Sequence, residues 1–126
     1  DGGSNYNTNI TCQQVRVYRT ASYTGDFGQD NTVAQYNGTG MQYLGESMAD
    51  DTSFGIVFGS IKIYNPSSTT YMKGFNARVS FSSPTGTVKE QWTNGAIDTL
   101  SAINAMKFMY SAGNIIAGKF KIYGYK

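Results

Sequence analysis

Residues 103–126 read INAMKFMYSAGNIIAGKFKIYGYK and contain two stretches in which apolar and polar side chains alternate. The apolar side chains that would share one face of extended chain are Met106, Phe108 and Tyr110 in the first stretch and Phe120 and Ile122 in the second. Gly113 and Asn114 lie between the stretches, where a tight connection needs positive φ. The pattern predicts a β-hairpin with one apolar face, which we expect to form part of the core.

Upstream of this hairpin, five further segments show the alternation of half-buried strands. They are residues 11–19, 36–48, 54–64, 71–82 and 87–93. In the longest, the side chains expected inward are Phe75, Ala77, Val79 and Phe81, and those expected outward are Asn76, Arg78 and Ser80. Gly59 indicates a bulge or a bend. Short turns join the strands, so we expect an all-β fold, an antiparallel β-sandwich of jelly-roll or related Greek-key type.

The domain organisation follows from the remaining segments. Residues 1–9 are almost all small and polar and predict an arm, and residues 10–126 predict a single β-sandwich domain. Residues 20–35 show little periodicity and are expected to form a long loop. Residues 96–104 have helical spacing but are short for a stable helix, which favours a single turn or a loop closing the end of the sandwich.

Composition limits the classes of partner. Of the 126 residues 14% are charged and the net charge is +2, which is too weak a field to hold nucleic acid. No apolar run is long enough for a transmembrane helix, so no membrane insertion is expected. The single Cys12 is expected to be a buried thiol. Aromatic residues make up 14% of the chain, so some of them must lie on a surface or in an interface.

A four-residue pattern recurs in three predicted strands, in which an apolar pair alternates with a basic residue and a tyrosine. The basic and tyrosine positions are Arg16 and Tyr18, Lys62 and Tyr64, and Lys121 and Tyr123. On one sheet face these side chains would combine apolar area, hydroxyl groups and cations. Such a face suits a subunit contact or sugar binding, and it is equally typical of the solvated side of half-buried strands.

Catalytic groups are scarce. The chain has no histidine and one cysteine, which argues against the commonest general base and against cysteine-rich zinc sites, so no metal, no cofactor and no enzymatic activity is expected. Loop carboxylates could form a glycosidase pair or a calcium site, but solvated loop acids are the more common case. These residues are Asp26, Asp30, Glu46, Asp50 and Asp51.

Aromatic residues outside the predicted core offer a second kind of site. Sugar rings stack on aromatic side chains, so a glycan site could use the tryptophan and loop tyrosines. The candidates are Trp92, Tyr23, Tyr36 and Tyr43.

The C-terminal stretch resembles the closing hairpin of many virion proteins of tailed bacteriophages. The shared features are an apolar strand ending near Phe108, the Gly113-Asn114 turn, the Ala117-Gly118 pair, and an ending in which Ile122 replaces the leucine of the usual Leu-Tyr-Gly. Residues 55–65 and the spacing of Trp92, Ile97 and Ile103 extend the resemblance over about the last 70 residues. The resemblance implies a structural or adhesive module, often trimeric, in tail fibres, tailspikes or on the capsid surface.

Composition and resemblance together lead to one expectation and one alternative. We expect a non-enzymatic structural protein of a phage virion surface, acting in capsid decoration or as a fibre knob. Its partners would be further copies of itself, with a homotrimer favoured, and other virion proteins. The alternative is a receptor- or glycan-binding domain of a tail fibre or tailspike used in host attachment.

Overall fold

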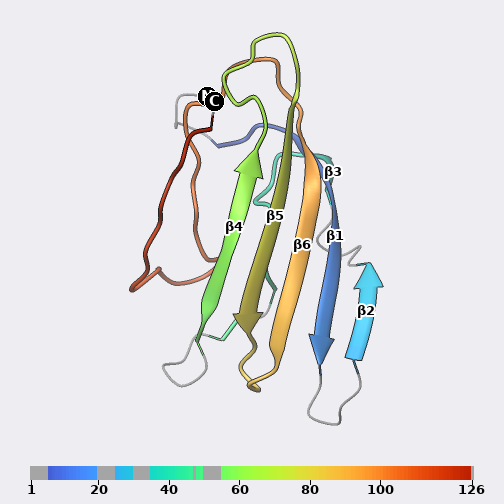
Figure 1. Cartoon of the computed structure of the whole chain (residues 1–126), viewed down its shortest axis with the longest axis vertical. Helices are drawn as coiled ribbons and strands as arrows, with labels where there is room; N and C mark the ends of the chain where they lie inside the picture. Colours follow the sequence, from blue (N-terminus) through green and yellow to red (C-terminus); the bar gives the residue numbers. More distant parts are fainter. Residues whose placement is uncertain (1–5, 20–24, 30–34, 47, 50–54, 126) are drawn as a thin grey trace.

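The fold is one antiparallel β-sheet. The computed structural model describes residues 6–19, 25–29, 35–46, 48–49 and 55–125, with the backbone alone described at residues 19, 25–29 and 35. The strands are β1 (Ile10–Arg19), β2 (Gly25–Gln29), β3 (Gln35–Gly38), β4 (Val57–Ile63), β5 (Lys73–Ser82) and β6 (Val88–Ile97). Their order across the sheet is β2-β1-β6-β5-β4, and β3 pairs with the other half of β1 along the edge that β2 occupies (Figure 1). The all-β prediction is therefore confirmed at the level of a single sheet.

The predicted β-sandwich needs a second sheet, and the described residues do not form one. They contain no helix either, and so no helix there is long and apolar enough to cross a membrane.

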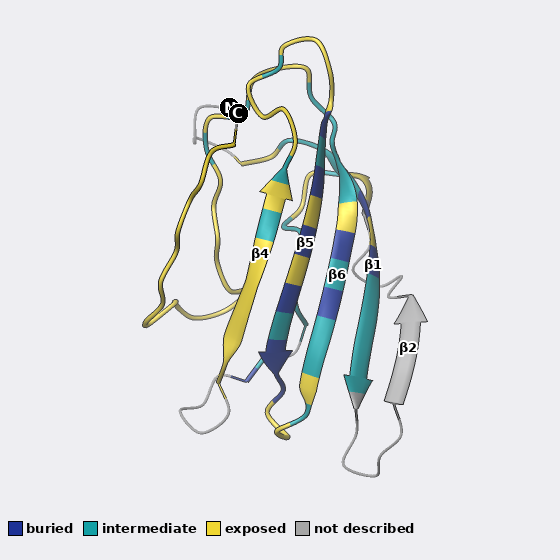
Figure 2. Ribbon diagram, in the orientation of Figure 1, coloured by how far each residue is buried: buried dark blue, intermediate teal, exposed yellow. Residues whose placement is uncertain are grey.

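Strand β5 holds the centre of the core, as its alternation predicts. Its inward side chains are buried, with exposed fractions of 8% for Phe75, 5% for Ala77, 7% for Val79 and 0% for Phe81. Asn76 and Arg78 between them are exposed, which gives the banded colouring of this strand in Figure 2. Apolar burial along this single strand is the main hydrophobic contribution that the sheet makes to stability.

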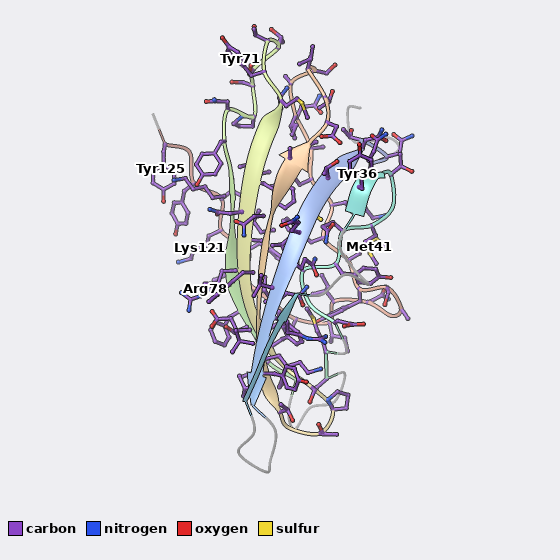
Figure 3. All side chains as sticks on the ribbon, turned by 90° about the vertical axis from the view of Figure 1, so that its right-hand side faces the viewer. Tyr36, Met41, Tyr71, Arg78, Lys121 and Tyr125 are labelled. Carbon is purple, nitrogen blue, oxygen red and sulfur yellow. The ribbon has the colours of Figure 1, made fainter. Side chains whose placement is uncertain are left out.

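The two faces of the sheet carry different side chains. The core face carries the β5 residues above together with Cys12, Gln14, Arg16 and Tyr18 of β1, Gln91 and Thr93 of β6, and Val57, Ile61 and Ile63 of β4. The open face carries Val15 and Val17 of β1, Arg78 of β5, Trp92 of β6, and Phe58 and Lys62 of β4. Figure 3 shows Arg78 and Met41 on opposite sides of the sheet, with Met41 on the core side.

The described part of the segment from 39 to 49, residues 39–46 and 48–49, covers part of the core face. Their contacts to the sheet join Gln42 to Cys12, the Tyr43 carbonyl to Gln14, Glu46 to Arg16, and the Ala49 amide to the Ser82 carbonyl. The sequence predicts a strand over residues 36–48, but the structure has a strand only at its start, β3. The rest of that segment crosses the face as irregular chain, because it satisfies its polar groups through β1 side chains rather than through a ladder.

The turns between β4, β5 and β6 agree with the sequence. Asn65 has φ of +50° and its carbonyl accepts the Ser68 amide at 3.0 Å, which closes the predicted turn at Asn65 and Pro66. Gly86 has φ of +75° and donates to the Ser83 carbonyl at 2.9 Å, which closes the β5–β6 hairpin. Cys12 is a buried thiol, as predicted, and it donates a hydrogen bond to Gln42 Oε1 at 2.6 Å.

Two loop predictions are corrected. Residues 20–35 do not form one long loop, because β2 lies inside that range and pairs with β1 from Val15 to Arg19. Of the two alternatives for residues 96–104, the structure has a loop and no helical turn, and the loop covers only residues 98–104 because β6 extends to Ile97. In both cases the strand bounds are set by backbone pairing with a neighbouring strand, which side-chain periodicity in the sequence does not reveal.

The predicted C-terminal hairpin is also corrected. Gly113 has the expected positive φ of +76°, but no strand is assigned in residues 98–125, and the side chains from 106 to 125 are exposed. Figure 1 shows this segment running down and back up on the β4 side of the sheet without joining it. An isolated two-stranded hairpin is marginal in water, and residues 39–49 already occupy part of the core face on which it would have packed.

Candidate functional site

Arg16 and Tyr18 lie on the core face, where Arg16 already has partners. Its Nη1 atom is 2.6 Å from Oε2 of Glu46, and its guanidinium lies 5.6 Å from the centre of the Tyr18 ring. Gln14 next to it is fully buried and bonds to both the Tyr43 carbonyl and the Gln91 side chain. These contacts hold the covering segment on the sheet, so this cluster serves folding.

The six residues predicted to form one basic-tyrosine face are not brought together. Lys62 and Tyr64 lie on the open face, whereas Arg16 and Tyr18 lie on the core face, because β1 and β4 enter the sheet with opposite alternation. Lys121 and Tyr123 lie in the C-terminal segment, outside the sheet. The prediction of a single shared face is wrong, since a one-residue difference in register reverses which side chains point outward.

The open face does carry one half of the predicted pattern. The Lys62 ammonium lies 4.8 Å from the centre of the Tyr64 ring, and the Tyr64 hydroxyl accepts a hydrogen bond from Asn76 at 3.2 Å. On β5, the strand next to β4, the Arg78 guanidinium lies 5.8 Å from the centre of the Trp92 ring on β6. The result is a flat surface of aromatic rings, amides and cations.

Arg78 and Glu90 form an ion pair on the same face. The hydrogen bond from Arg78 lowers the pKa of the Glu90 carboxyl below its ordinary value, and the Glu90 partner raises the pKa of Arg78. Both groups are accessible to water, so the pair is screened and contributes little to stability. Their charges nearly cancel, which leaves Lys62 as the cation of this face without a described ion-pair partner.

The candidate glycan residues do not converge either. Trp92 is half-buried on the open face, Tyr36 is 90% exposed on β3, and Tyr43 is 38% exposed in the segment that covers the core face. Tyr23 lies outside the described residues. The three described residues, Trp92, Tyr36 and Tyr43, therefore do not form one aromatic surface.

The candidate acids show no shared site where they are described. Glu46 is paired with Arg16 on the core face. Asp30, Asp50 and Asp51 lie outside the described residues, and for Asp26 only the backbone in β2 is described. Within the described part of the chain, no three histidine, cysteine, aspartate or glutamate side chains gather to hold a metal ion.

Strand β4 forms an uncovered edge of the sheet. It pairs with β5 on one side, and none of the described residues forms a strand on the other. The bonds from Tyr64 to Gly74 and from Ser82 to Ile56 set the alternation, so the backbone groups of the residues between them can be assigned. The residues that direct their N–H and C=O groups away from β5 are Val57, Gly59, Ile61 and Ile63. This row is here called the β4 edge, and its neighbour Phe58 is 62% exposed on the open face.

The C-terminal segment, residues 104–125, carries ten of the 21 exposed large apolar side chains of the described chain. The exposed fractions of its large apolar side chains include 46% for Met106, 40% for Phe108, 96% for Ile116, 62% for Phe120, 88% for Ile122 and 86% for Tyr125. Its internal contact is the stacking of Phe108 on Phe120 at 5.5 Å, and Lys107 lies 5.8 Å from the Tyr6 ring. The segment begins just after Ile103, whose amide donates to the Pro66 carbonyl at 2.8 Å.

Sequence reasoning found this segment but assigned it to the core. The signal that could have corrected the assignment is the apolar content of both faces, because Met109 and Ile115 oppose the predicted apolar face and are also exposed. A strand that is apolar on both faces must be covered on both faces.

Comparison with known proteins adds no family assignment. No protein-family model, no curated protein and no solved structure matches this chain.

Proposed function

We propose that this chain is a non-enzymatic structural protein of a phage virion surface, a capsid decoration or fibre-knob module. It works through contacts with further copies of itself and with other virion proteins. The observation that carries the proposal is the exposed apolar C-terminal segment beside the uncovered β4 edge. Monomeric proteins rarely expose contiguous apolar patches beyond a few hundred Å², and larger patches mark contact surfaces.

The energetic argument rests on the most exposed of these side chains. Ile116 and Ile122 are 96% and 88% exposed, so each has few contacts within its own chain that would be broken on moving into an interface. Burying one such side chain against a partner contributes about 1.5–3 kcal/mol. Several of them together can offset the cost of association, which makes an oligomer the expected state.

Assembly would also supply the missing layer of the fold. The second layer would be the sheet of a neighbouring copy, and two facing sheets would give the β-sandwich of jelly-roll or related type that the sequence predicts. The resemblance of residues 103–124 to phage virion proteins favours a trimer. On a particle with many copies, weak contacts by residues 1–9 and by the sheet would add through multivalency.

The proposal is tested by the oligomeric state and by the composition of particles. Light scattering coupled to gel filtration of the full chain, over a wide concentration range, should give a discrete oligomer. Mass spectrometry of purified particles that carry this protein should find it in stoichiometric copies. A chain that stays monomeric at high concentration and is absent from intact particles would exclude the proposal.

A second candidate is a receptor- or glycan-binding domain on the same virion. The observation that favours it is the open face, where Trp92, Tyr64 and Asn76 lie on a flat surface next to the cations Lys62 and Arg78. Rings of this kind stack on sugars, and amides bond to hydroxyl groups. A glycan array should then give hits that Trp92→Ala removes, and an array without hits would count against this candidate.

A further inference from the structure

Two incomplete features occur in the same chain. The β4 edge directs four N–H and four C=O groups to a side where no described residue accepts or donates. The C-terminal segment is extended chain for which the structure records no backbone hydrogen bond among the described residues. An exposed edge is a template for pairing with another extended segment, and unpaired extended chain is what such an edge binds.

The side-chain pattern of the distal part of this segment matches the two faces of β4. Along residues 115–123, one face is apolar, with Ile116, Phe120 and Ile122, and the opposite face is mixed, with Lys119, Lys121 and Tyr123 beside Ile115. Strand β4 has the same division, with Val57, Ile61 and Ile63 on the core face and a mixed open face of Ser60, Lys62 and Phe58. A paired segment would therefore continue the apolar face beyond β4 and keep its lysines in water.

Charge favours contact between this segment and the body of the sheet. Residues 99–126 contain four lysines and no acidic residue, whereas residues 1–98 contain all eight acids and six of the ten basic residues. Two C-terminal segments would repel each other, and one segment and one body attract. This difference argues against packing of segment on segment as the first contact.

Attachment of the segment argues for a second copy as the acceptor. Its root is held by the bond from Ile103 to Pro66, close to the end of its own β4, yet in the folded chain it leaves that edge unpaired. Eleven residues, 104–114, separate the root from the distal part and can span up to about 36 Å when extended. That reach is enough to bring residues 115–123 to the β4 edge of a neighbour.

We propose that residues 115–123 of one copy add as an extra strand to the β4 edge of a second copy. The nine residues cover the seven of β4, with Ile116, Phe120 and Ile122 on the core-face side. Repeated from copy to copy, this exchange is head-to-tail and closes into a ring, such as a trimer, if the rotation allows. The inference deepens the proposed function, since it names the contact by which that oligomer forms.

The first test changes the two partners separately in the full chain. Ile122→Ser alters a side chain that is 88% exposed, so the folded monomer should be unaffected while the dissociation constant of the oligomer rises about tenfold to a hundredfold. Ile61→Pro removes an outward N–H and leaves the β4–β5 hydrogen bonds in place, and it should weaken the oligomer at least tenfold. The matched control is Tyr36→Ser, a side chain that is 90% exposed on β3, at the opposite edge of the sheet, and it should change nothing.

The second test identifies which chains are joined. Ser60→Cys in one tagged chain and Lys119→Cys or Lys121→Cys in a differently tagged chain are mixed and oxidised, while the native Cys12 stays buried. A disulfide between the two tags is expected. Ser60→Cys combined with Lys121→Cys in one chain should likewise give cross-links between chains.

The outcomes separate this inference from the proposed function. An oligomer that persists with an unchanged dissociation constant in Ile122→Ser and Ile61→Pro, and gives no cross-link between tags, would overturn the exchange and leave the proposed function standing. A disulfide that forms only within one chain would show that the segment closes on its own β4, which also overturns it. A chain that is monomeric at all concentrations and absent from particles would remove both.

Discussion

Gly59 provides the sharpest test of how the sheet is built. A Cβ atom at this position would clash with the carbonyl oxygen of Arg78 and lie 2.8 Å from Cα of Val79. Both obstacles are backbone atoms of β5, so no side-chain rotation can relieve the clash. The Gly59→Ala variant must push β4 away from β5, which weakens the hydrogen bonds on either side of this position.

The size of the effect follows from those contacts. Overpacking of this kind, including two weakened hydrogen bonds, costs about 2–3 kcal/mol. The smaller backbone entropy of unfolded alanine offsets about 0.5–1 kcal/mol. The expected net loss in the free energy of unfolding is therefore about 1–2.5 kcal/mol, which lowers the urea midpoint by about 0.5–1.2 M for a slope of about 2 kcal/mol per M.

The measurement is urea unfolding followed by Trp92 fluorescence and circular dichroism at one fixed protein concentration, since association would shift the midpoint. Gly74→Ala is the matched control, because its Cβ would meet nothing closer than Tyr64 Cδ2 at 3.8 Å. That variant should be neutral or slightly more stable. A Gly59→Ala midpoint equal to or above the wild type, or an equal loss in Gly74→Ala, would refute the close approach of β4 and β5.

Three further outcomes are expected. Phe81→Ala, at a side chain with no exposed area, should lower the free energy of unfolding by about 3–5 kcal/mol, read from the shift in Tm. Arg78 lowers the pKa of Glu90 in the folded state, so the Arg78–Glu90 ion pair stabilises the fold at pH values above the ordinary pKa of 4.5. This stabilisation is lost as the pH falls through the folded pKa. The small difference in the free energy of unfolding between wild type and Glu90→Gln should therefore vanish in acid. Gln14→Met leaves the Gln91 amide and the Tyr43 carbonyl without their hydrogen-bond partner, which should lower the free energy of unfolding by about 1–3 kcal/mol. In a double-mutant cycle, Gln14→Met combined with Gln91→Met should cost less than the sum of the two single changes.

The buried polar side chains of the core face were not predictable from periodicity. Gln14 and Gln91 sit at positions that alternate correctly for a buried face, but their residue types favour solvent. Val15 and Val17, the apolar pair of β1, lie on the open face, whereas Arg16 and Tyr18 lie on the core face. Hydrogen bonds from residues 39–49 decided this orientation, and those bonds join positions about 30 residues apart in the chain.

Gly59 shows a similar limit. The sequence suggests a bulge or bend there, yet the register from Val57 to Ile63 continues without a shift. The glycine is required by the approach of the neighbouring strand, and a bulge and a close approach leave the same mark in a sequence.

Local residue pattern alone determined that the chain is all-β, where β1, β4, β5 and β6 lie, which side of β5 is buried, and which turns join β4, β5 and β6. Each of these depends on side chains or turn residues within about ten positions of one another, where the period of two and the demand for positive φ act directly. Tertiary structure decided the pairing of β2, the face of β1 that is buried, and the absence of strands from residues 103–125 in the single chain. Those outcomes depend on contacts between backbone groups and apolar surfaces that are distant in the sequence, because a strand is stable only when a partner satisfies its hydrogen bonds and covers its apolar face.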